Sequence, residues 1–293
     1  MNTWLVEKLC CPGCGGRLAQ VGEGLKCSAC SRSFECHDDI PILVAQDPAD
    51  RHTAEQVEYF EKEARARGEY SIEPWQRRYL ERLRESYVPC DGDLVVDLGA
   101  GSGFMAIELA KLNCTCIACD ITLTNLVQVS TVARRLGLAE RVHVVCCDVQ
   151  NLPIGSDIVD CVIANSILEH LPRDTRAASE INRVCRRRAG LMVSAPLAFK
   201  YIYPPFWPIH FVHDREMGHL RHYDDMSLAR IFSDWEQSCV YYTGHFRKVA
   251  ARLAELVGMS VDWERVEQTD RRLEDKRYGA STVICVFGRG TGA

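Results

Sequence analysis

The stretch 94–104, Leu-Val-Val-Asp-Leu-Gly-Ala-Gly-Ser-Gly-Phe, joins a strand, a glycine-rich turn and the start of a helix. Residues 94–96 are apolar and mostly β-branched, which predicts a buried strand, and the amphipathic residues 105–112 predict a helix. The three glycines between them let the backbone approach a ligand closely because they carry no Cβ. Strand, glycine turn and helix in this order are typical of nucleotide-binding α/β folds.

The spacing of this turn narrows the kind of ligand. Its G-x-G-x-G pattern differs from the G-x-G-x-x-G of dinucleotide enzymes, and no Gly-Lys-Ser/Thr follows to make a phosphate-binding loop. Asp97 precedes the glycines, and a carboxylate suits a ligand with a positive centre or an amino group better than a pyrophosphate. Taken alone, the pattern also fits a tight turn in any α/β domain.

Two further aspartates follow strand-like segments. The apolar runs 116–119 and 142–147 predict strands, and Asp120 and Asp148 come directly after them. A carboxylate about 20 residues after a glycine turn commonly holds ribose hydroxyls in such folds. Three strands that each end in an aspartate form a much more specific pattern than the glycine turn does.

This pattern resembles motif I and the following strands of class I S-adenosylmethionine-dependent methyltransferases. The resemblance implies an α/β fold with a Rossmann-like, seven-stranded, doubly wound sheet and S-adenosylmethionine as cofactor. It implies that Asp120 binds both ribose hydroxyls and that Asp148 approaches the adenine amino group. The cofactor-binding residues implied in this way are Asp97, Gly99, Ala100, Gly101, Gly103, Phe104, Asp120, Ile121, Asp148, Val149 and Asn165.

The chain contains 16 cysteines, and four of them are spaced like metal ligands. Cys11 and Cys14 form one C-x-x-C turn, and Cys27 and Cys30 form a second. Four thiolates in this arrangement suit a closed, tetrahedral structural zinc site, although unligated thiols are the alternative. A segment this short cannot build a sufficient core alone, so bound zinc is expected to supply folding free energy.

The surrounding pattern, including the ending Asp39-Ile-Pro41, resembles the small zinc-ribbon proteins that activate methyltransferases. We therefore expect a zinc-ribbon domain at residues 1–45. In front of an rRNA guanine methyltransferase such a ribbon binds RNA, which keeps an rRNA or tRNA base methyltransferase as an alternative function. Residues 1–45 contain no basic patch, because acidic residues balance the basic ones Lys8, Arg17, Lys26 and Arg32.

Composition limits the class of protein further. Hydrophobic residues make up 47% of the 293 residues, which suffices for one large domain and a small one. The net charge of −5 gives no general attraction to nucleic acid. The sequence shows neither a signal-peptide pattern nor an apolar run long enough for a membrane span, so we expect a cytoplasmic protein.

Residues 46–90 predict a linker followed by helices, and residues 91–293 predict the methyltransferase domain. Helices before motif I cover the cofactor in the family, so Tyr59 and Tyr70 are expected either near its methionine end or in the core. Further along, residues 174–187 predict a helix whose closing arginines, residues 186–188, would complement the helix dipole. Residues 191–195 predict the fifth strand.

After the predicted fourth strand at 158–164, the segment from Asn165 to Pro172 includes Leu-Glu-His-Leu. It resembles motif IV of the small-molecule branch of the family, which makes His170 a candidate general base. Alternatively, His170 is only packed at the start of a helix and has no catalytic role. The segment lacks the Asn/Asp-Pro-Pro-aromatic motif of amino-methylating nucleic-acid enzymes and the Pro-Cys of cytosine C5 enzymes.

Residues 197–223 are rich in aromatic residues, proline and histidine, and we expect them to form a substrate-covering insertion at the cofactor side of the sheet. The segment resembles a G-H-x-R-x-Y pattern of bacterial methyltransferases, which makes His219 and Tyr223 candidate catalytic residues. A second metal site built from His210, His213, His219 and His222 is an alternative without diagnostic spacing.

The sequence as a whole predicts an enzyme that transfers a methyl group from S-adenosylmethionine to an oxygen or nitrogen of a small-molecule acceptor. Its candidate catalytic residues are His219, Tyr223 and His170, and its structural zinc ligands are Cys11, Cys14, Cys27 and Cys30. A non-catalytic cofactor-binding or activator subunit is an alternative from another class of protein. The three aspartates argue against it, because a dead enzyme has no reason to keep them. The sequence predicts neither the oligomeric state nor the identity of the acceptor.

Overall fold

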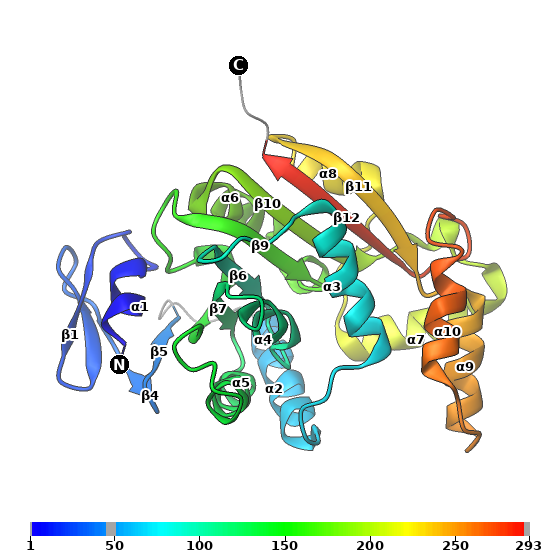
Figure 1. Cartoon of the computed structure of the whole chain (residues 1–293), viewed down its shortest axis with the longest axis horizontal. Coiled ribbons are helices and arrows are strands. Elements are labelled where there is room, and N and C mark those ends of the chain that lie inside the picture. Colours follow the sequence, from blue (N-terminus) through cyan, green and yellow to red (C-terminus); the bar gives the residue numbers. More distant parts are fainter. Residues whose placement is uncertain (1, 45–50, 290–293) are drawn as a thin grey trace.

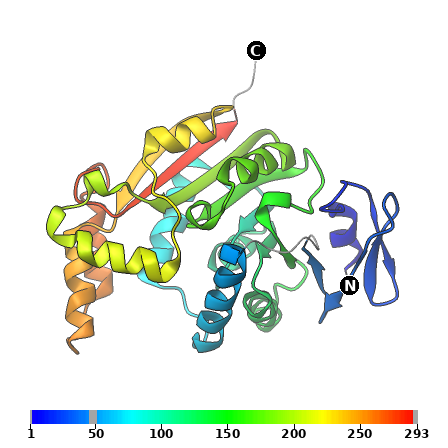
Figure 2. The ribbon, with the colours of Figure 1, turned by 180° about the vertical axis from the view of Figure 1, so that it is seen from behind.

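The computed structural model describes residues 2–44 and 51–289, and a large mixed β-sheet forms its centre (Figures 1 and 2). The strand order in this sheet is β11-β12-β10-β9-β6-β7-β8-β5-β4. Its middle five strands run parallel and are β6 (Leu94–Leu98), β7 (Thr115–Asp120), β8 (Val142–Cys147), β9 (Val159–Asn165) and β10 (Cys185–Pro196). β12 (Thr282–Arg289) and β11 (Trp235–Thr243) continue the sheet in antiparallel fashion beyond β10.

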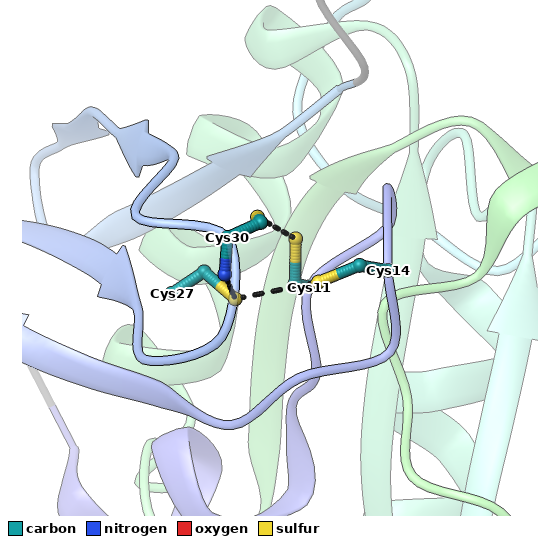
Figure 3. A group of neighbouring side chains, drawn as sticks. All are labelled: Cys11, Cys14, Cys27 and Cys30. Carbon is teal, nitrogen blue, oxygen red and sulfur yellow. Dashed lines mark hydrogen bonds between the residues drawn. The ribbon is translucent and has the colours of Figure 1, made fainter.

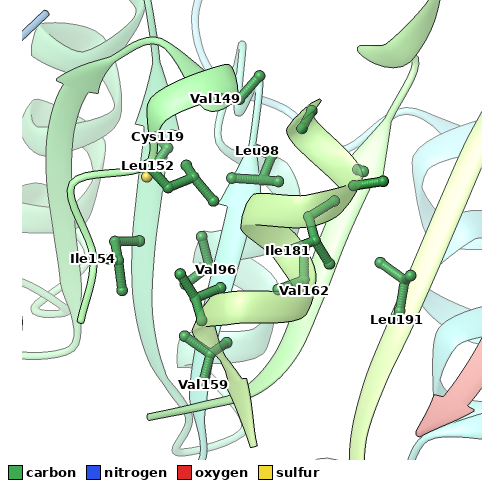
Figure 4. Close-up of a cluster of buried hydrophobic side chains, with 14 of the residues drawn as sticks. Val96, Leu98, Cys119, Val149, Leu152, Ile154, Val159, Val162, Ile181 and Leu191 are labelled. Atoms are coloured by element: carbon green, nitrogen blue, oxygen red, sulfur yellow. The ribbon is translucent and has the colours of Figure 1, made fainter. Parts of the chain in front are cut away.

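Helices cover both faces of the sheet, as the near-continuous apolar runs of its central strands require. Side chains alternate between the faces, so Val95 packs on one side and Val96 on the other. The first face carries α3 (Pro74–Ser86), α4 (Phe104–Ala110) and α5 (Leu123–Arg135). The second carries α6 (Asp174–Val184) and α8 (Asp225–Ile231), and Figure 4 shows Ile181 of α6 against Val96, Val162 and Leu191.

The chain changes direction within the sheet at β6. β7 and β8 follow on one side of β6, whereas β9 and β10 return on the other. Loops that leave the carboxyl ends of β6 and β9 therefore diverge, and open α/β sheets bind ligands at such a switch point. Asp97, the glycine turn and Asn165 all lie at this edge of the sheet.

The prediction of a doubly wound α/β sheet is confirmed, and the seven expected strands are β6 to β12. Two more strands come from the N-terminal segment. β5 (Ile40–Leu43) runs parallel to β8, with Ile42 opposite Cys146, and β4 (Cys36–His37) pairs with β5. The large sheet thus has nine strands instead of seven.

The rest of the N-terminal segment consists of α1 (Thr3–Lys8) and a small antiparallel sheet of β1 (Leu18–Val21), β2 (Gly24–Cys27) and β3 (Ser33–Phe34). It lies beside β8 and the segment that follows β8 (Figure 1). The Cys10 amide donates to the Pro153 carbonyl over 2.9 Å, and the Gly155 amide donates to the Lys8 carbonyl over 2.8 Å. The ring of Trp4 also stacks on His143 of β8, 4.7 Å between centroids.

The division into domains at 1–45, 46–90 and 91–293 stays a proposal. Its first boundary, and most of the expected linker, lies at residues 45–50, outside the described residues. The two expected helices in 46–90 are α2 (Arg51–Ala66) and α3. The described contacts show that the N-terminal segment shares both a sheet and a hydrophobic core with the rest of the chain.

The expectation that residues 186–188 end a helix is wrong. α6 stops at Val184, because Cys185 already has extended backbone angles and pairs with Val159. The three arginines lie in the first part of β10, where Arg186 forms an ion pair with Asp160, 2.6 Å between nitrogen and oxygen. Three consecutive arginines are typical of a helix end, but here the pairing of β10 with β9 determines the local structure.

Residues 197–223 contain more regular structure than a loop. Two short 3-10 turns, η3 (Phe199–Tyr201) and η4 (Pro204–Phe206), lead into α7 (Trp207–Met217). α7 lies at the same end of the molecule as α9 (Phe246–Leu256) and α10 (Trp263–Arg271) in Figure 1. Across residues 2–44 and 51–289, we find no helix with the length and apolarity that a membrane span requires.

Candidate active site

The glycine turn after β6 has a backbone that side chains would obstruct. Gly99 and Gly103 have φ angles of +64° and +73°, which residues with a Cβ rarely adopt. A Cβ on Gly99 would also lie 2.8 Å from Ile167 Cδ1, and one on Gly103 would lie 2.6 Å from Val129 Cγ2. The sequence therefore needs glycine at both positions to keep the turn close to the sheet edge.

Two buried aspartates fix the shape of this turn. Asp120 accepts the Gly101 amide over 2.9 Å through Oδ2 and the Thr122 amide over 2.8 Å through Oδ1. Asp97 accepts the Ala106 amide over 3.3 Å. Burial raises the pKa of Asp97 to about 7, and burial likewise raises the pKa of Asp120. A cationic group beside these carboxyls would favour their charged forms.

Two adjoining cavities lie along the carboxyl ends of the parallel strands. The first, about 170 Å³, reaches from the glycine turn past β7 to β8 and is lined in part by Gly99, Gly101, Asp120, Ile121, Asp148 and Val149. The second, about 820 Å³, lies on the other side of the turn and is lined in part by Asp97, Gly99, Ala100, Gly101, Phe104 and Asn165. Nearly all of the expected cofactor-binding residues thus line one continuous groove, and Gly103 lies behind it at the start of α4.

A family model described as "Methyltransferase domain" matches residues 96–193, which include the glycine turn, all three aspartates and the Leu-Glu-His-Leu segment. Residues 96–193 are thus similar to a methyltransferase domain. The matched segment contains the three acidic strand ends and part of the groove, whose wall also includes Arg67 and Tyr70 from outside it.

Curated relatives agree with this domain. The chain is 31% identical to demethylmenaquinone methyltransferase of Mycobacterium tuberculosis (strain ATCC 25618 / H37Rv) over 119 residues, 40% of this chain and 47% of that protein. It is 29% identical over 144 residues to a probable S-adenosylmethionine-dependent methyltransferase of Mycobacterium tuberculosis (strain CDC 1551 / Oshkosh), covering 49% of this chain and 50% of that protein. The chain thus spans about half the length of the curated relatives it matches.

Solved structures agree with the fold. Geranyl diphosphate C-methyltransferase from Streptomyces coelicolor A3(2) superposes with a TM-score of 0.60 at 14% identity, over 83% of this chain and 99% of that chain. The [4+2]-cyclase SpnF superposes with a TM-score of 0.56 at 17% identity, over 82% of this chain and 94% of that chain. At this identity the likeness shows the fold alone, and the cyclase illustrates that one fold hosts different chemistry.

Several residues that line the groove were not predicted. Thr122, Asn125 and Gln150 line the first cavity, and their places just after strand ends were a usable signal. Arg67 also lines it and donates to Asn125 Oδ1 over 2.9 Å, although nothing in the local sequence marks this arginine. Tyr70 lines the second cavity and donates to Glu108, whereas the Tyr59 hydroxyl contacts the sulfur of Met217.

A third cavity, about 360 Å³, adjoins the groove and is rich in histidine. We call it the histidine cavity; its wall includes Ser166, Glu169, His170, His210, His213, Asp214, His219 and His222. Ser166 also lines both parts of the groove, so the three cavities meet at this residue. A ligand in the histidine cavity would therefore lie next to one in the groove.

The three candidate catalytic residues have different surroundings. His170 and His219 both line the histidine cavity, with 4.9 Å between ring centroids. Burial lowers the pKa of His170 to about 3, so its ring is neutral at physiological pH. The Tyr223 hydroxyl donates to Asp174 over 2.8 Å and lies in the hydrophobic core, and Tyr223 does not line the histidine cavity.

Asp214 of α7 orients two histidines of the cavity. One of its oxygens lies 2.8 Å from His219 Nδ1 and the other lies 2.9 Å from His222 Nε2. Burial alone would raise the pKa of Asp214, but the hydrogen bonds from both imidazoles hold it well below its usual range. Because Nδ1 of His219 is held by Asp214, Nε2 is the ring nitrogen that remains for other partners.

The four cysteines of the N-terminal segment meet at one point (Figure 3). The Sγ atoms of Cys11 and Cys30 lie 3.8 Å apart, and those of Cys14 and Cys27 lie 3.5 Å apart. A tetrahedral zinc with Zn–S bonds of about 2.3 Å has ligand sulfurs about 3.8 Å apart. The four thiols therefore have the chemistry and spacing that a structural zinc ion requires.

Proposed function

We propose that this protein is an S-adenosylmethionine-dependent methyltransferase that acts on an oxygen or nitrogen of a small-molecule acceptor. The observation that carries the proposal is the junction at Ser166, where the groove and the histidine cavity meet. The cofactor would supply an activated methyl group bonded to a positively charged sulfur. A cofactor and an acceptor in adjoining cavities would be aligned for in-line transfer, which is the main catalytic requirement of such a reaction.

Within the groove, Asp97 would hold the cofactor's amino group, Asp120 its ribose hydroxyls, and Asp148 the adenine amino group. The acceptor's lone pair would form the new bond to carbon while the carbon–sulfur electron pair stays on sulfur. A proton on the acceptor would leave to a base or to water. In the N-terminal segment, we propose that Cys11, Cys14, Cys27 and Cys30 bind one structural zinc ion.

Methyl transfer is tested by incubating the purified protein with methyl-labelled S-adenosylmethionine and a small-molecule extract of cells. Mass spectrometry should then find S-adenosylhomocysteine and a labelled compound that is heavier than its precursor by about 14 mass units, the mass of CH₂, plus the mass of the label. Cofactor binding without any labelled product from small molecules or RNA would support the non-catalytic alternative. Labelled RNA would support the ribosomal or transfer RNA alternative.

Replacing Asp120 by alanine should weaken S-adenosylmethionine binding by roughly 1.5–3 kcal/mol, the range for a lost hydrogen bond to a charged group. The carboxylate lies in the groove and also fixes the amide of Gly101. Isothermal titration calorimetry measures the affinity. Asp91→Ala is the control, because Asp91 is exposed and lies outside the residues that line the groove. Wild-type affinity in Asp120→Ala would remove Asp120 from the proposed site.

The pKa of Asp97, about 7 in the free protein, predicts a pH-dependent affinity for the cofactor. Raising the pH through 7 ionises Asp97 and so strengthens its attraction for an ammonium group. Above about pH 8 the ammonium of the ligand itself loses its proton, and affinity should fall. Calorimetry with S-adenosylhomocysteine should show affinity falling up to about tenfold per unit below pH 7. In Asp97→Asn, the affinity should change little with pH below pH 7. An equally steep fall of affinity in that variant would contradict the assignment.

A further inference from the structure

Three side chains with metal-binding chemistry converge on the wall of the histidine cavity. Glu169 and His170 come from η2 (Leu168–His170), and His219 comes from the segment just after α7. Their candidate ligand atoms, one carboxylate oxygen and two imidazole nitrogens, all lie within 4.8 Å of one another. Ligands of one metal ion lie about 3 Å apart, so small side-chain rotations would bring these atoms to a common centre.

Two of the three side chains have buried polar atoms whose hydrogen-bonding capacity is unused. Glu169 is only 1% exposed, and its Oε2 has no hydrogen-bond partner among the described residues. His170 is 7% exposed, and within the same described part of the chain its Nδ1 is likewise unpartnered. Buried polar groups in folded proteins are normally hydrogen-bonded, so two adjacent exceptions require an explanation. A bound cation would satisfy both atoms at once.

The third side chain is held as metal-binding histidines usually are. Asp214 Oδ1 accepts from His219 Nδ1 over 2.8 Å, which leaves Nε2 as the nitrogen available to a metal. An overlapping set of Asp214, His219 and His222 is also close enough to hold a cation. In that set both carboxylate oxygens already lie within 2.9 Å of an imidazole nitrogen. Asp214 Oδ1 thus orients His219, and Asp214 Oδ2 lies beside His222, whereas Glu169 Oε2 has no hydrogen-bond partner among the described residues and is the oxygen that we assign to a metal.

We propose that Glu169, His170 and His219 bind one divalent first-row transition-metal ion in the histidine cavity. Two imidazoles and a carboxylate suit ions such as iron, cobalt, nickel or zinc in the +2 state. Three protein ligands leave coordination positions open, as in sites that bind substrate. This site is separate from the four-cysteine cluster, which has a closed set of thiolates and lies in the N-terminal segment.

The position of the site suggests what it would do, and this step rests on the proposed methyl transfer. The histidine cavity meets the groove at Ser166, so a cation there would face an acceptor beside the methyl group. It would recognise an acceptor that carries an oxygen ligand, such as a hydroxyl, and would favour loss of that hydroxyl's proton. The metal site therefore narrows the acceptor class to oxygen-bearing small molecules.

Equilibrium dialysis of the full-length, zinc-containing protein against Co²⁺ tests the site, with zinc and cobalt counted separately by elemental analysis. The first zinc ion per chain reports the four-cysteine cluster, because soft thiolates favour zinc over cobalt, and any further zinc or cobalt reports the histidine cavity. The wild type should bind one Co²⁺ per chain. Glu169→Gln, which removes the carboxylate but keeps the side-chain volume, should bind Co²⁺ at least about tenfold more weakly. His222→Gln is the matched control and should keep near wild-type Co²⁺ affinity.

Binding of S-adenosylhomocysteine by the same samples, measured without acceptor or turnover, shows whether each variant is folded. This measurement also distinguishes failure of the metal proposal from failure of the proposed function. Methyl transfer could be absent while Co²⁺ still binds, and Co²⁺ could fail to bind while methyl transfer occurs. The proposal would be overturned if a wild type that binds S-adenosylhomocysteine held neither Co²⁺ nor a second zinc ion beyond the four-cysteine cluster. It would also be overturned if Glu169→Gln kept wild-type Co²⁺ affinity, or if only His222→Gln lost it.

Discussion

Replacing Cys11 by serine should remove zinc from the protein and destabilise the whole chain, not only its first forty residues. Zinc binding contributes roughly 10–16 kcal/mol in small zinc modules, and losing one thiolate forfeits much of it. Leu5 and Leu9 belong to the same hydrophobic core as Val96 and Leu98 of β6, and β5 pairs with β8. Loosening the N-terminal segment therefore exposes apolar surface of the methyltransferase domain.

We expect the Cys11→Ser variant to contain less than one zinc per chain and to lose about 3 kcal/mol or more of its free energy of unfolding. Elemental analysis and denaturant unfolding measure the two effects. Cys36→Ser is the matched control, since Cys36 lies in the same segment but outside the four-cysteine cluster. The assignment of a structural zinc would be wrong if wild-type protein, purified without chelator, contained no metal.

Replacing His219 by alanine should lower turnover by about 10²-fold or more while S-adenosylhomocysteine affinity stays near the wild-type value. His219 lines the histidine cavity but neither part of the groove. Steady-state kinetics with the true acceptor and calorimetry with S-adenosylhomocysteine measure the two effects. His37→Ala is the control, because His37 is an exposed residue of β4.

The kinetic details distinguish the possible roles of His219. If it is a general base, the low-pH limb of the rate profile should disappear in His219→Ala. If it instead holds the acceptor in place, directly or through the proposed metal ion, the low-pH limb should survive and KM should rise. Normal methylation by a folded variant would show that His219 is inert packing.

The sequence predicted the strand ends that form the groove, because this part of the fold depends on short-range patterns. Buried apolar runs ending in Asp97, Asp120 and Asp148 specify strands, and parallel strands bring their carboxyl ends to one edge of the sheet. The glycine turn needs only its own residues to be recognised. Arg67 escaped prediction because its contact with Asn125 joins residues 58 positions apart, which no local pattern encodes.

The histidine cavity was harder to predict because its structure depends on distant contacts. α7 shows no clear apolar stripe, and Trp207, Phe211 and Val212 are exposed, so helical periodicity gave no signal. Gln56 of α2 donates to the Met217 carbonyl at the end of α7, a contact across 161 positions. Ser166 was unremarked in the sequence, yet it adopts a φ of +47° where three cavities meet.

The pairing of β5 with β8 also affects how the protein avoids aggregation. All six residues of β8 are buried, and without β5 this apolar strand would present unpaired amides and carbonyls at the margin of the sheet. Such an edge is a template for adding a strand from another molecule. On this side the sheet ends with β4, a two-residue strand that includes the exposed His37, so beyond β5 little edge is left for a neighbour to extend.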